Sequence, residues 1–156
     1  MRILIDTNVL VDYIAKREPY FKNAECIITL CANEKIQGCI AAHSVMDAIY
    51  ITRKEYTIDE RRKILTGICC ILDVIGIDKY KIEKILTNDK FSDVEDCLQM
   101  ECAKEFCADY IVTRNIKDFQ NSAIKPILPD EFLMRISLKK SLLPVRKKKS
   151  IENQIT

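Results

Sequence analysis

The chain has 156 residues, which is enough for one domain with a single hydrophobic core and too few for two. Hydrophobic residues make up 48% of it and charged residues 31%, a composition typical of globular rather than disordered proteins. Three glycines and four prolines exclude collagen-like and glycine-rich chains and disfavour turn-dense all-β folds. No run reaches about 18 apolar residues, and the first six residues turn acidic too early for a signal peptide, so we expect a cytoplasmic protein with no membrane partner.

The first half of the chain alternates short apolar runs with longer segments of helical periodicity. The apolar runs at residues 2–5 and 37–42 predict strands. Apolar residues at helical spacing predict helices at residues 9–16, 20–34, 44–55 and 58–72. Ser44 and Thr57 are the expected N-caps of the last two helices, because each has an acidic residue three positions later, as in a capping box.

The second half continues this alternation. Strands are expected at residues 73–77, 110–113 and 127–128, and helices at residues 79–86, 93–107 and from 129 onward. Ser92 is the expected N-cap of the helix at 93–107, because Glu95 follows at capping-box spacing, and residues 114–119 are expected to form a turn. Short strands alternating with amphipathic helices predict an α/β fold: a three-layer α/β/α sandwich around a mainly parallel central sheet.

The eight cysteines include no Cys-x-x-Cys pair, and His43 is the only histidine. A structural zinc site is therefore not expected, because such sites need closely spaced Cys and His ligands. Most of the cysteines lie among apolar residues, so we expect reduced thiols that pack as small hydrophobic side chains. We interpret His43 as a residue at the end of a strand rather than as a catalyst.

Charge is unevenly distributed along the chain. Residues 135–156 contain seven basic residues and one acidic residue, whereas residues 1–134 contain 18 basic and 22 acidic ones. We therefore divide the chain into a domain at residues 1–134 and a basic C-terminal tail at residues 135–156. Such a tail suits contact with nucleic acid, because lysine and arginine release counterions from phosphates. A solvated terminus without a specific role is the alternative.

Carboxylates follow several of the expected strands or lie in the first turn of the next helix. They are Asp6, Asp47, Asp93, Asp96 and Asp118. In open α/β sheets the carboxyl ends of the strands form the ligand-binding edge, and carboxylates gathered in one crevice repel one another unless a cation neutralises them. Oxygen ligands without Cys or His suit Mg²⁺ or Mn²⁺, which can activate water and stabilise charge on a phosphodiester during its displacement.

Each of these acids also has a structural explanation. Asp47 could complete a capping box, and Asp93 and Asp96 could complement a helix dipole. Asp118 could satisfy backbone amides in a turn. Asp6 is the hardest to explain in this way, because it follows a buried Ile-Leu-Ile run, where an unpartnered charge is costly. The expected gathering of all these acids at one sheet edge favours a functional site.

Four segments of the sequence resemble the PIN-domain family in order and spacing. They are residues 5–10 (Ile-Asp-Thr-Asn-Val-Leu), 44–50, 93–96 and 111–119 (Ile-Val-Thr-Arg-Asn-Ile-Lys-Asp-Phe). The resemblance extends from residue 3 to residue 134 and implies a parallel-sheet α/β/α sandwich with Mg²⁺- or Mn²⁺-dependent ribonuclease activity. Many bacterial and archaeal members are VapC-type toxins, typically dimeric and held inactive by an antitoxin, so an antitoxin partner and a homodimer are also implied.

The resemblance assigns roles to individual residues. The acids implied as catalytic and metal-binding are Asp6, Asp47, Asp96 and Asp118, with Asp93 as a further metal ligand. Asp47 stands where most members have Glu, and Asn115 where many have Asp, so the fourth acidic role falls either to Asp118 or to the Asn115 amide oxygen. Asn8 and Thr113 are small polar residues at motif positions, expected to hold the acids or a water in place.

The resulting prediction is a metal-dependent endoribonuclease that hydrolyses RNA phosphodiesters. The expected RNA-binding residues are basic side chains near the site or in the tail: Arg53, Lys54, Arg114, Lys117, Arg146, Lys147, Lys148 and Lys149. The alternative is a catalytically degenerate PIN-like module that binds RNA or protein, which the departures at positions 47 and 115 favour. Haloacid-dehalogenase and receiver folds are excluded, because the first needs a second Asp at the position of Asn8 and the second needs adjacent acids after its first strand.

Overall fold

The computed structural model describes residues 1–141 of the chain, with side chains to residue 138, and in this part five strands form one sheet. The strands are β1 (Arg2–Ile5), β2 (Gln37–Ala41), β3 (Asp73–Ile75), β4 (Tyr110–Val112) and β5 (Pro126–Ile127). Their order across the sheet is β3-β2-β1-β4-β5, and all four pairings are parallel. The central strand is therefore the first in the sequence, and it lies between β2, the next strand, and β4, which comes from far along the chain.

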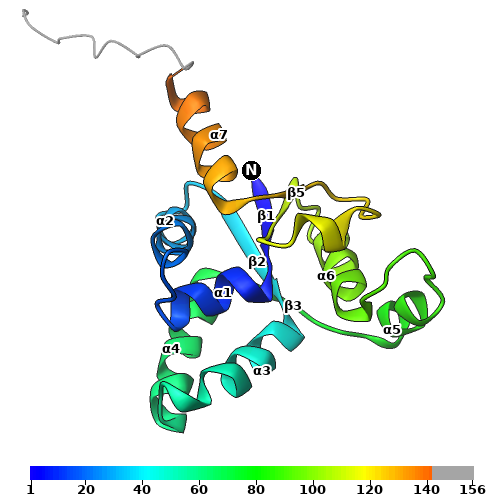
Figure 1. Ribbon diagram of the computed structural model, residues 1–156, viewed down its shortest axis with the longest axis horizontal. Helices are drawn as coiled ribbons and strands as arrows, with labels where there is room; N and C mark the ends of the chain where they lie inside the picture. The colour runs from blue at the N-terminus through cyan, green and yellow to red at the C-terminus, as the bar shows by residue number, and fades with distance from the viewer. Residues whose placement is uncertain (142–156) are drawn as a thin grey trace, which may run out of the picture.

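Seven α-helices of the described residues flank this sheet (Figure 1). They are α1 (Thr7–Ile14), α2 (Phe21–Ala32), α3 (Ala42–Ile51), α4 (Ile58–Ile71), α5 (Lys79–Leu86), α6 (Val94–Glu105) and α7 (Pro129–Ser141). In Figure 1, α1, α2 and α4 lie on one side of the sheet, and α5 and α6 lie on the other. The fold is an α/β sandwich around a parallel sheet, and the predicted fold class is confirmed.

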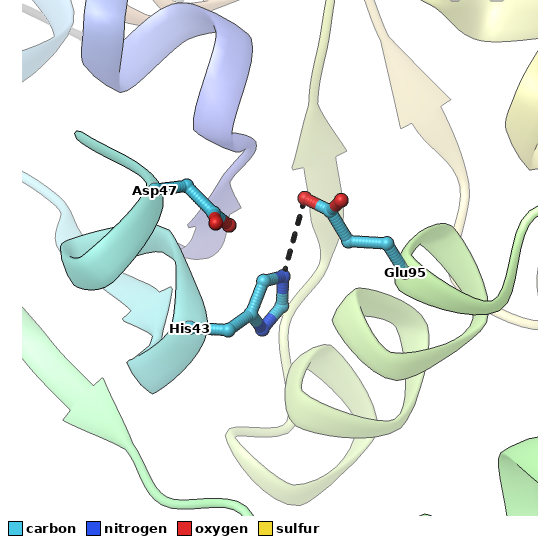
Figure 2. Close-up of side chains that lie close together, drawn as sticks. All are labelled: His43, Asp47 and Glu95. Carbon is cyan, nitrogen blue, oxygen red and sulfur yellow. Dashed lines mark ion pairs between the residues drawn. The ribbon is translucent and has the colours of Figure 1, made fainter. Parts of the chain in front are cut away.

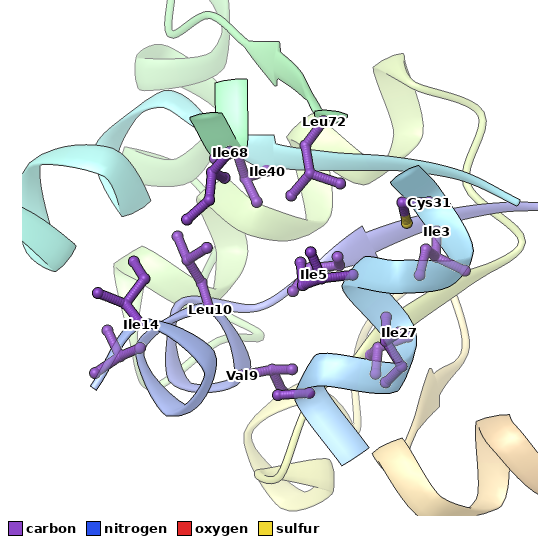
Figure 3. Packing of buried hydrophobic residues seen from close by; sticks show 14 of the residues in the cluster. Ile3, Ile5, Val9, Leu10, Ile14, Ile27, Cys31, Ile40, Ile68 and Leu72 are labelled. Carbon is purple, nitrogen blue, oxygen red and sulfur yellow. The ribbon is translucent and has the colours of Figure 1, made fainter. Parts of the chain in front are cut away.

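The hydrophobic core covers both faces of β1. Ile3 and Ile5 pack into one cluster with side chains of α1, α2 and α4, while Leu4 packs into a second cluster with side chains of α6. Figure 3 shows residues of the first cluster, among them Ile5 of β1, Val9 of α1 and Ile27 of α2. A parallel strand buried on both faces is expected to be apolar without alternation, which explains the Ile-Leu-Ile run. Asp6, the residue that follows β1, consequently lies at the middle of the sheet edge, where the central strand ends.

One of two predicted N-caps in the first half is confirmed and the other is wrong. Thr57 caps α4 in a capping box, in which its side chain accepts from the Glu60 amide and the Glu60 carboxylate accepts from the Thr57 amide. Ser44 is not an N-cap, because α3 already begins at Ala42. The Ser44 hydroxyl is buried instead, 2.7 Å from the Thr7 hydroxyl of α1. A contact between two helices has displaced the local capping interaction.

The predicted N-cap of α6 is also wrong. Asp93 occupies that position rather than Ser92, and its side chain accepts a hydrogen bond from the Glu95 amide at 2.8 Å. The other predicted helices and strands agree closely with the observed ones, and the expected turn at residues 114–119 contains a 3-10 turn at Ile116–Phe119. The chain after α3 continues as a second 3-10 turn, Thr52–Lys54.

All eight cysteines lie in the described part of the chain, and none of them forms a disulfide there. Four of them are buried and pack in the two clusters, and burial raises the pKa of the Cys31 thiol to about 12. No helix among residues 1–141 combines the length and the apolar character that crossing a membrane requires.

Candidate active site

Polar side chains gather at the edge of the sheet where β1 and β4 end, and they enclose a pocket of about 260 Å³. The acidic residues of its lining are Asp6, Asp93, Glu95, Asp96 and Asp118, and the neutral polar ones include Asn8, Gln99 and Asn115. The structure therefore brings four of the five predicted acids together and adds Glu95, which the sequence analysis treated only as part of a capping box.

Asp6 is the most tightly held of these acids. Its side chain is 3% exposed, and both carboxylate oxygens accept hydrogen bonds. Gln99 donates to Oδ1 at 2.7 Å, and Thr113 donates to Oδ2 at 2.5 Å, where the Asn8 amide donates as well. Asp6 precedes α1 directly, but its side chain makes no capping hydrogen bond to that helix.

The hydrogen bonds around Asp6 tie the ends of β1 and β4 together. The Thr113 hydroxyl, besides donating to Asp6, accepts from the Asn115 backbone amide at 2.9 Å. The Asn8 side-chain oxygen accepts from the Arg114 amide at 3.3 Å. Asn8 and Thr113, the two residues expected to hold the acids in place, thus each contact Asp6 directly. The carboxylate is fixed from both strands before any ligand arrives.

The pocket is electrostatically unfavourable without a cation. Burial, followed by the charges of Asp6, Asp93, Asp118 and Glu95, raises the pKa of Asp96 to about 7. Burial also raises the pKa of Asp6, against the opposing effect of its hydrogen bonds from Thr113 and Gln99. Burial and like charges both disfavour ionised carboxylates, so a divalent cation entering the pocket would relieve both penalties. The donors are carboxylate and amide oxygens, which fit the hard ions Mg²⁺ and Mn²⁺.

Asp47 lies apart from the pocket lining, on the half-buried face of α3. Figure 2 shows its carboxylate facing the same space as the side chains of His43, from the first turn of α3, and Glu95, from the first turn of α6. One ligand atom from each of the three lies within 4.8 Å of the others. Burial, with the charges of Asp47, Asp93 and Asp6, raises the pKa of Glu95. Glu95 therefore connects the pocket with a second group of ligand atoms.

Two residues at this edge were missed by sequence reasoning. Gln99 is buried and donates to Asp6, and it lies three residues after Asp96, so the two share a face of α6. That spacing was the only indication in the sequence. Asp12 is buried in α1, and burial raises its pKa against the opposing charges of Arg114 and Arg17. No pattern in the sequence distinguishes Asp12 from an ordinary surface aspartate.

The expected RNA-binding residues have different surroundings. Arg114 forms an ion pair with Asp12, with 2.8 Å between Nε and Oδ2, and its guanidinium lies 4.1 Å from the centre of the Tyr20 ring. Arg114, Tyr20 and Asn115 line a neighbouring pocket of about 560 Å³. Lys117 is exposed in the 3-10 turn after β4. The tail residues Arg146, Lys147, Lys148 and Lys149 lie outside the described residues.

The chain matches the model of a known protein family. The family is described as the PIN domain, and the match covers residues 2–117. No curated protein sequence shows significant similarity to the chain.

Solved structures with the same fold include several toxin–antitoxin assemblies. VapBC2 from Rickettsia felis, bound to a DNA fragment from its promoter, has a chain with a TM-score of 0.59 and 19% identity, and the match covers 82% of this chain and 98% of that one. A toxin–antitoxin complex from Klebsiella pneumoniae gives 0.62 and 19%, with coverages of 81% and 97%. FitAB bound to an IR36 DNA fragment gives 0.60 and 16%, with coverages of 81% and 94%. At these identities the comparison establishes the shared fold.

Proposed function

Because the chain belongs to the PIN domain family, whose members are nucleases, we propose that it is a divalent-metal-dependent endoribonuclease that hydrolyses RNA phosphodiesters. One observation carries the proposal. Asp6 is a buried carboxylate with both oxygens hydrogen-bonded, and it lines a pocket together with four more acids. A bound cation would relieve the repulsion among these carboxylates and the burial cost of Asp6.

Asp6, Asp96 and Asp118 would hold the metal, with Asp93 as a further ligand from the lining of the same pocket and the Asn115 amide oxygen as a neutral donor. A bound Mg²⁺ or Mn²⁺ supplies an acidified water and screens charge that develops on the phosphate. Gln99 and Thr113 hold Asp6 in one orientation, so that its oxygens are preorganised for an incoming ion.

The structural neighbours support a narrower version of the proposal. Three of them are toxin–antitoxin assemblies, so we propose that this chain is the toxin of such a pair and that an antitoxin protein binds it. We further propose a cytoplasmic homodimer. Met46 and Tyr50, which are exposed one turn apart on α3, offer apolar surface for an association between copies.

A non-catalytic PIN-like module that binds RNA or protein is the second candidate. The observation that favours it is the position of Asp47, which lies outside the lining of the pocket although the family resemblance gives it a metal-binding role. Asn115 also favours this candidate. It is neutral where many family members have Asp, so it lowers the negative charge of the pocket.

The test is cleavage of total cellular RNA by the purified protein with Mg²⁺ or Mn²⁺. We expect new RNA ends with the wild-type protein, none with EDTA, and a rate at least about a hundredfold lower for Asp6→Asn, because even partners behind a metal ligand contribute about 10–100-fold. Asp59→Asn, an identical change at an exposed position on α4, is the matched control and should cleave normally. RNA profiles unchanged by wild-type protein would favour the non-catalytic module.

A further inference from the structure

The imidazole of His43 has an unusual environment for the only histidine in the chain. Both ring nitrogens are shielded from solvent, and within the described residues neither has a hydrogen-bond partner. Nε2 faces Glu95, with 3.5 Å to Oε1, at a separation and alignment that do not make a hydrogen bond (Figure 2). A buried polar atom without a partner is costly and calls for an explanation.

Two carboxylates lie beside His43, and together with its imidazole they are spaced as the ligands of one metal ion would be. His43 and Asp47 are four residues apart, so they share one face of α3, and Glu95 approaches them from the first turn of α6. Their ligand atoms lie within 4.8 Å of one another. Metal bonds of about 2.1 Å at tetrahedral angles place neighbouring ligand atoms about 3.4 Å apart. The observed 3.5 Å between Nε2 and Oε1 matches that spacing.

We propose that His43, Asp47 and Glu95 form a binding site for a first-row transition-metal dication. Two carboxylates balance the charge of the ion, and imidazole binds it as a neutral ligand. Imidazole suits Co²⁺, Ni²⁺ or Zn²⁺, whereas Mg²⁺ takes oxygen ligands, so this donor set discriminates against Mg²⁺. Three protein ligands leave at least one coordination position open.

The site adjoins the pocket of Asp6, because Glu95 belongs to both. It would therefore place a second, nitrogen-bound ion beside the carboxylate pocket. This role deepens the proposed nuclease function and rests on it. The binding of the ion does not rest on that function, since it depends only on the three side chains.

Titration of the metal-free, full-length protein with Co²⁺ tests the proposal, because the visible absorption of bound Co²⁺ responds to a nitrogen ligand. We expect wild-type protein to bind Co²⁺ with such a spectrum and excess Mg²⁺ to leave it in place. His43→Gln and Glu95→Gln should each weaken this binding at least about tenfold. Asp6→Asn, which alters the adjoining pocket, and Glu25→Gln, on the exposed face of α2, should both keep the spectrum.

Co²⁺ affinity and spectrum that are the same in wild type, His43→Gln and Glu95→Gln would overturn the proposal. Circular dichroism establishes that the variants are folded. Asp47→Asn alters a ligand that lies outside the lining of the Asp6 pocket, so its loss of Co²⁺ binding decides the question if His43→Gln fails to fold. RNA cleavage measured in parallel separates the two proposals. An intact Co²⁺ spectrum without cleavage refutes the nuclease alone, and cleavage with no effect of His43→Gln on Co²⁺ binding refutes the second site alone.

Discussion

At the scale of single residues, Asp6 shows how a buried carboxylate can be kept in place. Ionised carboxylates are costly to bury, but hydrogen bonds to the charged form recover part of that cost. Asp6 receives them from Gln99, Thr113 and Asn8, which belong to three separate segments of the chain. The arrangement orients both oxygens. Removal of a single donor should therefore weaken the binding of any metal ion that the carboxylate holds.

Thr113→Val tests this expectation, because it removes the hydroxyl and keeps the shape of the side chain. We expect metal affinity and RNA cleavage to fall about 10–100-fold, as they do when partners of metal ligands are removed. Titration with Mn²⁺ and initial cleavage rates measure the change. Thr52→Val is the matched control, since Thr52 is equally buried and its hydroxyl donates to the Ala48 carbonyl, away from the pocket. Equal losses in the two variants would assign Thr113 a role in stability alone.

At the scale of helices and strands, a local sequence pattern predicted the cap of α4 correctly, but the same pattern failed at α6, where the adjacent Asp93 replaces Ser92 as N-cap. Thr57 and Glu60 are both exposed, so their capping box depends on four consecutive residues only, and it was predicted. Ser44 has the same spacing to an acid, yet its hydroxyl is used by Thr7, which lies 37 residues earlier. Because that partner lies outside any local window, the start of α3 could not be predicted from the pattern.

The close approach of Cys31 in α2, and of Leu72 just after α4, to β2 leads to a prediction about glycine. A Cβ added at Gly38 would lie 2.7 Å from Cys31 Sγ and 2.8 Å from Leu72 Cδ2, so Gly38→Ala should destabilise the protein by about 1–3 kcal/mol through overpacking. Gly67 lies in α4 with no atom within 4 Å of such a Cβ, so Gly67→Ala should stabilise by about 0.5–1 kcal/mol through helix propensity. Urea denaturation measures both. Equal effects of the two substitutions would contradict the close approach at Gly38.

At the scale of the whole molecule, strand order determines which predicted residues meet. The sequence identifies Asp6, Asp47 and Asp118 as following strands, but it does not say that β2 and β4 lie on opposite sides of β1. Asp118 consequently lines the pocket with Asp6, whereas Asp47 lies beside His43 on the side of β2. Long-range pairing, rather than any motif, therefore separates the acids into two groups that share Glu95.

The uneven distribution of charge along the chain leads to a prediction about RNA affinity. We propose that the tail residues Arg146, Lys147, Lys148 and Lys149 contact RNA phosphates, as their charge suggests. Replacing all four with Gln should weaken binding of single-stranded RNA and lower the slope of log affinity against log salt by about 3, since each phosphate contact contributes about 0.7. Fluorescence anisotropy at several salt concentrations measures the slope. A slope unchanged by the four substitutions would leave the tail without a role in RNA binding.

The central position of β1 also bears on the order in which the site is assembled during synthesis. Asp6 is translated before Gln99 and Thr113, which follow it by 93 and 107 residues. β4, which must pair with β1 to bring Thr113 to Asp6, is the fourth strand in the chain. Contacts between residues so far apart form late, because the intervening chain must first be made and ordered. A growing chain therefore carries Asp6 without Gln99 and Thr113 until α6 and β4 have been made, and the pocket is complete only after that.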